Sequence, residues 1–213
     1  MSKEKCTEEL QLIMPELNNI PDCILPKPDD ISYYILENER IIYLDYDINH
    51  YVMEIHRMIL RWNLEDINVP TEERRPIRIF IMSPGGELVY MWALLDAIMT
   101  SETPIYTINI GTAASAAALL FMAGSKRYMF PNSIIMIHEG SASMSGDSTK
   151  ILDMSEDYKK ELQRMKDFIL LRTNIPKTQL NKKRSNDWSL NTEQCIEYGI
   201  ATNVVQKLSE VLN

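Results

Sequence analysis

Ser115 is the residue most suited to chemistry, because it lies where a strand-like segment passes into a helical one. Residues 105–110 carry the β-branched and aromatic side chains of a buried strand, which Gly111 is expected to end. From Ser115 onward, helix-forming Ala, Leu, Phe and Met follow. A hydroxyl here faces unpaired backbone N–H groups at the positive end of a helix dipole. This suits a serine nucleophile, although serine is also a favoured N-cap of an ordinary core helix.

His138 is the histidine best placed to activate such a hydroxyl. Of the three histidines, His50 falls in a polar turn and His56 on an amphipathic helix, where packing or surface roles suffice. His138 instead ends the apolar segment 133–137. Imidazole titrates near neutral pH, so His138 is a candidate general base, with a purely structural histidine as the alternative.

A nucleophilic serine also needs hydrogen-bond donors for the oxyanion that its attack creates. Residues 83–86, Ser-Pro-Gly-Gly, join a predicted strand at 76–82 to a predicted helix at 88–99. Gly86 can expose its N–H in such a turn, and Ala116 can offer a second N–H directly after the serine. An ordinary strand-to-helix loop would account for the glycines equally well.

Asp187 is one of several acids that could orient the imidazole of His138. It lies in a polar, basic stretch, residues 178–189, before a short predicted helix at 191–198 that Gly199 ends. A carboxylate in this role stabilises the charged imidazole. From the residues alone, a capping or turn role for Asp187 is equally possible.

The elements that position these residues alternate between strand and helix. We expect a first strand at 40–46, a helix at 51–63, and a further strand pair at 127–130 and 133–137. This order favours right-handed crossovers and a mostly parallel sheet, whose sites form at the carboxyl ends of the strands. Gly86 and Ser115 both fall at such ends.

Three segments lie outside this alternation. Residues 1–30 are proline-rich after a short helical stretch and predict a separate N-terminal arm before a domain at 31–213. Residues 66–75 predict a polar loop with a solvated charge run. Residues 139–148 predict an exposed loop before a long helix at 150–174, whose apolar stripe could pack on its own core or on another subunit.

Composition limits the class of protein. The chain has 213 residues, 45% of them hydrophobic, and a formal net charge of −8, so a nucleic-acid surface is not expected. We expect no membrane span and no secretory signal. The three cysteines are scattered without metal-like spacing, so we expect a reducing, cytoplasmic setting. No metal or cofactor is expected in this chain.

Several motifs, taken together and in order over about residues 30–208, resemble the Clp protease proteolytic subunit. The matching segments are Asp30–Tyr33, Arg40–Leu44, Ser83–Gly86, Gly111–Ser115, Pro131–Ser133, Met136–His138, Asp187 and Glu197–Gly199. The resemblance implies an α/β, crotonase-like fold of repeated ββα units with a protruding handle helix. It also implies a serine endopeptidase that cuts unfolded polypeptides into short peptides.

The same resemblance assigns roles and partners. Ser115 becomes the nucleophile, His138 the base and Asp187 the orienting acid, with Gly86 and Ala116 as oxyanion-hole donors. A homo-oligomer of heptameric rings stacked as a tetradecamer is implied. So is an AAA+ unfoldase of the Clp type, which would consume the ATP.

The chain departs from the family where Glu139-Gly140 replaces Gln-Pro and where a serine-rich stretch, 141–147, replaces a glycine-rich strand. Residues 66–75 resemble an insertion, and the N-terminal arm does not match the axial segment of the family. Ring contacts and unfoldase docking are the properties that these differences affect. Two alternatives stay open: a non-catalytic or partner-dependent subunit of a mixed ring, and a crotonase-type acyl-CoA enzyme.

Overall fold

The computed structural model describes residues 28–140, 143–183 and 187–212. The predicted arm at 1–30 lies almost wholly outside the described residues, so the boundary at residue 30 stays a prediction. The chain runs as α1 (Pro28–Asn38), β1 (Ile41–Leu44), α2 (Val52–Glu65), a 3-10 turn (Thr71–Glu73), β2 (Ile77–Ser83), α3 (Leu88–Thr100), β3 (Ile105–Ala114), α4 (Ala116–Ala123), β4 (Lys126–Met129), β5 (Ile134–Ile137), α5 (Ser148–Arg172), α6 (Lys177–Lys183), β6 (Trp188–Leu190), α7 (Thr192–Glu197), β7 (Asn203–Val204) and α8 (Ser209–Leu212).

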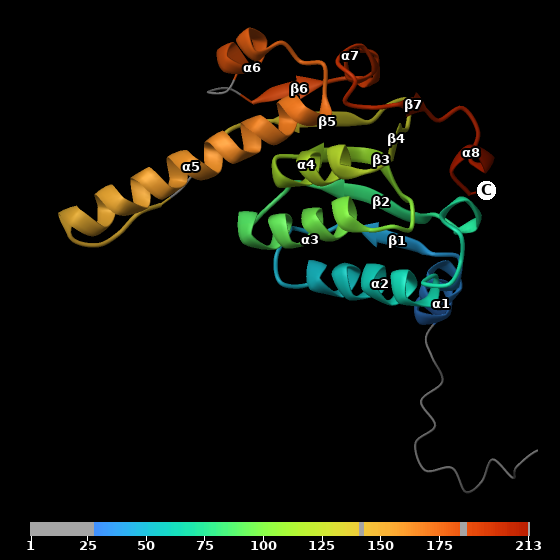
Figure 1. Cartoon of the computed structure of the whole chain (residues 1–213). Coiled ribbons are helices and arrows are strands. Elements are labelled where there is room, and N and C mark those ends of the chain that lie inside the picture. Colours follow the sequence, from blue (N-terminus) through green and yellow to red (C-terminus); the bar gives the residue numbers. More distant parts are fainter. Residues whose placement is uncertain (1–27, 141–142, 184–186, 213) are drawn as a thin grey trace, which may run out of the picture.

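The strands form one mostly parallel sheet in the order β1-β2-β3-β4-β7, as the alternating pattern predicted. β5 pairs in parallel with β3, and β6 pairs antiparallel with β5. Helices α2, α3 and α4 lie along one face of this sheet, and α5 runs from it well beyond the body of the molecule (Figure 1). This is the α/β crotonase-like architecture with a projecting handle helix.

The buried core lies between the sheet and the three helices. α2 contributes its apolar stripe, Val52, Ile55, Ile59 and Trp62. All eight residues of α4 are buried, so this short helix has no solvent-facing side. The helix that follows Ser115 is therefore held on every side by the core. No helix in the described ranges is long and apolar enough to cross a membrane.

β3 is longer than the sequence predicted, because Gly111 does not end it. The strand continues to Ala114 and changes neighbours on the way: residues 106–109 pair with β4, and residues 112–114 pair with β5. Asn109 is fully buried at the fork. Its amide donates to the carbonyl of Ile134 at 2.9 Å, and its carbonyl accepts from the N–H of Gly111 at 3.1 Å. Because β3 continues past this change of neighbours to Ala114, Ser115 lies directly after the end of the strand.

The polar segment 66–75 is only partly solvated, which corrects the sequence prediction at two residues. Asp66 is 6% exposed and accepts two hydrogen bonds from the Arg40 guanidinium, at 2.6 and 2.8 Å, and one from Thr103. The Arg74 side chain is 6% exposed and donates to the carbonyl of Val69. No hydrophobic pattern in the sequence predicts that Asp66 and Arg74 are buried, because hydrogen bonds and ion pairs, rather than apolar contacts, hold these charged side chains.

Candidate active site

The turn at Ser115 holds its backbone in a conformation that L-residues rarely adopt. Ser115 has φ 54° and ψ −121°, and it follows β3 directly and precedes α4. Its N–H donates to the carbonyl of Met136 on β5 at 2.8 Å, which ties the turn to the next strand. Non-glycine residues with positive φ persist only where the surroundings enforce them, and they concentrate at functional sites. The sharp strand-to-helix turn is the arrangement that exposes a nucleophile.

Ser115, His138 and Asp187 form a continuous chain of hydrogen-bond contacts. Ser115 Oγ lies 2.7 Å from Nε2 of His138, and Nδ1 of His138 lies 3.2 Å from Oδ1 of Asp187. The His138 side chain is 29% exposed and that of Asp187 is 73% exposed. If Nδ1 carries the proton, it donates to Asp187 and leaves Nε2 to accept from the hydroxyl. The structure thus brings together all three residues that the sequence singled out.

Strand register explains how residues so far apart in sequence meet. In the antiparallel β5–β6 pair, Ile137 lies opposite Trp188, so His138 and Asp187 occupy the next positions on neighbouring strands. In the parallel β3–β5 pair, Ala114 lies opposite Met136. Ser115 and His138 therefore follow the carboxyl ends of two neighbouring strands, at the same end of the sheet. β6 was not predicted from the sequence, and it is the element that places Asp187.

The glycine turn that contains Gly86, one of the two predicted oxyanion donors, touches the serine turn through Gly85. Gly85 and Gly86 have φ values of 100° and 149°, which glycine tolerates. A Cβ built on Gly85 would lie within 3.0 Å of Ser115 Cβ and of the backbone N of Ala116, so the glycine turn touches the nucleophile turn. Ala116 is the first residue of α4, where an N–H has no partner inside the helix.

The glycine turn is anchored from its outer side. Ile48 forms an isolated parallel bridge with Gly86, using the carbonyl of Gly85 and the N–H of Glu87 rather than the N–H of Gly86 itself. The Ser83 hydroxyl accepts from the Gly85 N–H and donates to the Tyr46 carbonyl. The N–H of Gly86 is thus left outside the bridge, although its use by an oxyanion stays a prediction.

Two arginines that the sequence analysis missed hold the other end of the nucleophile helix. Arg172, the last residue of α5, donates to the carbonyls of Met122 at 2.9 Å and Gly124 at 2.8 Å. Arg127 donates to the carbonyls of Gly199 and Ile200 and, at 3.4 Å, to that of Gly124. Burial lowers the pKa of both guanidinium groups from the usual arginine value. The signal in the sequence was the uniformly apolar segment 116–123. A helix buried on every side needs donors for its last carbonyls, because water cannot reach them.

A mainly apolar pocket opens beside His138. Its lining comes from the end of β5, from α5 and from α6: Ile137, His138, Glu139, Leu162, Met165, Lys166, Ile169, Leu180 and Asn181. Glu139, one of the departures from the family motif, lies at this pocket, and its carbonyl accepts from the Tyr158 hydroxyl at 3.0 Å. The departure after the histidine therefore borders the serine–histidine pair.

Comparison with known proteins identifies the family of the chain. The chain is 30% identical over 191 residues to ATP-dependent Clp protease proteolytic subunit 2 of Treponema denticola, covering 86% of this chain and 90% of that protein. It is 31% identical over 188 residues to proteolytic subunit 1 of Corynebacterium jeikeium, covering 87% and 97%. A proteolytic subunit from Deinococcus radiodurans is 28% identical over 180 residues, covering 84% and 86%. The Clp protease family model matches residues 29–208, and the chain belongs to the Clp protease family.

Proposed function

We propose that this chain is a serine endopeptidase, the proteolytic subunit of a Clp-type protease. The observation that carries the proposal is the contact chain from Ser115 Oγ through His138 to Asp187. Membership of the family supports the same reaction class. The chemistry is acyl transfer from a peptide bond to Ser115, followed by hydrolysis.

The proposed mechanism assigns one task to each group. His138 takes the Ser115 proton through Nε2 as the hydroxyl attacks the peptide carbonyl, and Asp187 stabilises the resulting imidazolium. The N–H groups of Gly86 and Ala116 hold the oxyanion. His138 then returns the proton to the leaving amine, and a water molecule, activated by His138 in turn, releases the acyl group. These steps need no cofactor in this chain.

The wider assembly is also part of the proposal. By analogy with the relatives, which are named as subunits of ATP-dependent proteases, we expect this chain to work as an oligomer with a separate Clp ATPase. Heptameric rings stacked as a tetradecamer, an AAA+ unfoldase that consumes the ATP, and unfolded protein substrates are the specific forms we propose. The apolar pocket beside His138 supports cleavage next to an apolar substrate side chain.

The acyl-CoA alternative is not favoured. It needs no serine–histidine pair and would have been supported by a large separation of Ser115 from His138, whereas the two side chains are 2.7 Å apart.

The second alternative, a non-catalytic subunit of a mixed ring, is distinguished from the proposal by labelling the chain with a fluorophosphonate and measuring its intact mass. We expect one adduct on the native chain and none on Ser115→Ala. A well-assembled native oligomer that resists labelling, alone and with a paralogue or unfoldase added, would contradict the proposal.

A further inference from the structure

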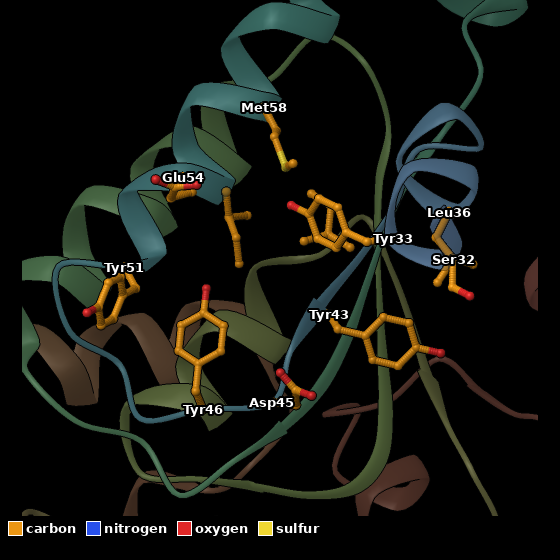
Figure 2. A pocket seen from close by; sticks show the side chains of 11 residues that line it. Ser32, Tyr33, Leu36, Tyr43, Asp45, Tyr46, Tyr51, Glu54 and Met58 are labelled. Carbon is orange, nitrogen blue, oxygen red and sulfur yellow. The ribbon is translucent and has the colours of Figure 1, made fainter. Parts of the chain in front are cut away.

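A second pocket lies away from the serine site, between α1, β1 and the start of α2. It is lined by side chains from these elements and from the loop between β1 and α2, with four tyrosines and two acids among them. The Tyr33 and Tyr46 hydroxyls and the Met58 side chain point toward the same space, and Glu54 and Tyr51 lie at its α2 side (Figure 2). None of these residues takes part in the chemistry proposed for Ser115, so the pocket is a separate feature of the surface.

The charged side chains that line this pocket are both acidic. Asp45 and Glu54 are its only charged lining residues within the described chain, and both are exposed. Burial, with smaller contributions from Tyr33, Asp45 and Glu54, raises the pKa of Tyr46 to about 12. The Tyr33 hydroxyl also has a raised pKa, from burial and then from Glu37 and Glu54. Both phenols therefore stay neutral beside the two acids.

Two polar groups of the pocket have no hydrogen-bond or ion-pair partner within the described part of the chain. Neither the Asp45 carboxylate nor the Tyr46 hydroxyl forms a hydrogen bond or ion pair with any residue that the structure describes. Among the described residues, the Glu54 carboxylate has one ion pair, with Arg57 at 3.5 Å on the exposed surface of α2. Exposed pairs of this kind contribute little, so Glu54 is available to a better partner.

Tyrosine faces next to carboxylates form an environment that attracts a cation and repels an anion. A lysine or arginine side chain satisfies both features, since its stem packs on apolar and aromatic surface while its charged end reaches an acid. Arginine suits them best, because its planar guanidinium stacks on aromatic rings and donates to a carboxylate through two N–H groups. We propose that this pocket binds a basic side chain, arginine in particular, presented by an extended segment of a partner protein.

The test uses the full chain with methyl-labelled methionine and the Ser115→Ala substitution, which prevents cleavage of the probe. The probe is the peptide acetyl-Ser-Arg-Ser-Arg-Ser-amide, and its neutral match is acetyl-Ser-Gln-Ser-Gln-Ser-amide. We expect the arginine peptide to shift the Met58 methyl resonance saturably, an effect that added salt weakens, and the glutamine peptide to leave it in place. In the double variant Asp45→Asn, Glu54→Gln, apparent affinity should fall at least tenfold.

The matched control is Asp153→Asn, Glu156→Gln, which removes two exposed acids from α5 and should leave peptide binding unchanged. Equal shifts with both peptides, or equal affinity in the Asp45/Glu54 variant, would overturn the proposal. A Met58 resonance that responds to dilution of the protein and not to the arginine peptide would assign the pocket to a second copy instead. Introduced with Ser115 intact, the Asp45/Glu54 substitutions should leave fluorophosphonate labelling unchanged, which separates this test from that of the proposed peptidase.

Discussion

At the scale of single residues, Asp187 is the most weakly held member of the predicted triad. Its side chain is 73% exposed, and its contact with His138, at 3.2 Å, is longer than the 2.7 Å contact between His138 and Ser115. Because solvent screens an exposed carboxylate, we expect Asp187 to act mainly by fixing the ring orientation and tautomer of His138. We expect Asp187→Asn to lower kcat about a hundredfold or more while leaving assembly intact.

The measurement for Asp187 is kcat on a short peptide substrate, with sedimentation as the check on assembly. Asp153→Asn, an exposed acid on α5, is the matched control and should keep native activity. A native rate in the Asp187 variant would remove this residue from the mechanism and leave a serine–histidine pair.

Asp66 is a residue whose charge supports the fold rather than the reaction. Its hydrogen bonds from Arg40, above all, hold the pKa of its carboxyl below the usual aspartate range. The ionised Asp66 carboxylate therefore stabilises the folded chain at pH values above about 4, the pKa of an aspartate in the unfolded chain. This stabilisation is lost as the pH falls through the lower pKa of Asp66 in the folded chain. We expect Asp66→Asn to destabilise the chain by about 3 kcal/mol at pH 7, because it leaves the buried Arg40 guanidinium with only the half-exposed Glu65 carboxylate, at 3.7 Å, as a charged partner.

The difference between native and Asp66→Asn chains should then shrink as the pH is lowered from 5 to about 3. Urea unfolding at several pH values measures it. Asp157→Asn, which removes an exposed partner of Lys160, serves as the control and should change stability little at any pH. A difference that stays constant down to pH 3 would show that the Asp66 charge does not stabilise the fold.

At the scale of elements, α4 connects the predicted oxyanion hole to Arg172. The helix has only eight residues, its first N–H belongs to Ala116, and its last carbonyls accept from Arg172. Loss of these donors leaves buried carbonyls without partners and allows the helix to shift. We expect Arg172→Met to lower kcat about tenfold with little change in KM, because a small misplacement of catalytic groups weakens the transition state more than substrate binding.

Arg172→Lys should recover part of that loss, since a lysine can donate to some of the same carbonyls. Lys159→Met, on the exposed surface of α5, is the control for removing a long basic side chain from this helix. Parallel unfolding curves separate a loss of positioning from a loss of fold. Equal kcat in the methionine variant and the native chain would show that Arg172 does not position α4.

The same scale shows what the sequence could predict. The bounds of α2 and α3 were predicted within a few residues. Their many apolar side chains indicate which residues are buried, and this makes such helices visible in the sequence. α6 and β6 were missed, since α6 buries only Leu180 and β6 has three residues. The triad residues were singled out from their positions and the family resemblance. Their meeting depends on strand register, which no local pattern encodes.

At the scale of the whole molecule, the second half of α2 and the residues after it present an apolar ridge that the described part of the chain does not cover. Leu60, Leu64 and Ile67 are 64%, 67% and 65% exposed. Leu60 and Leu64 are four residues apart on one side of α2, and Ile67 follows the end of the helix and lines the same hollow. Leu60 and Leu64 also line a hollow between α2 and α3. Exposed apolar surface of this kind marks protein interfaces, and an oligomer is part of the proposed function.

We expect Leu60→Glu combined with Leu64→Glu to dissociate the assembly, because a charge at the centre of an interface is desolvated without a partner. Sedimentation velocity should show a smaller species, and peptidase activity should fall with it if the active site depends on its neighbours. Leu208→Glu, at a leucine that is 58% exposed and distant in sequence from the ridge, is the control and should assemble as the native chain does. A double variant that still assembles would place the subunit contacts elsewhere and leave the α2 ridge free for another protein.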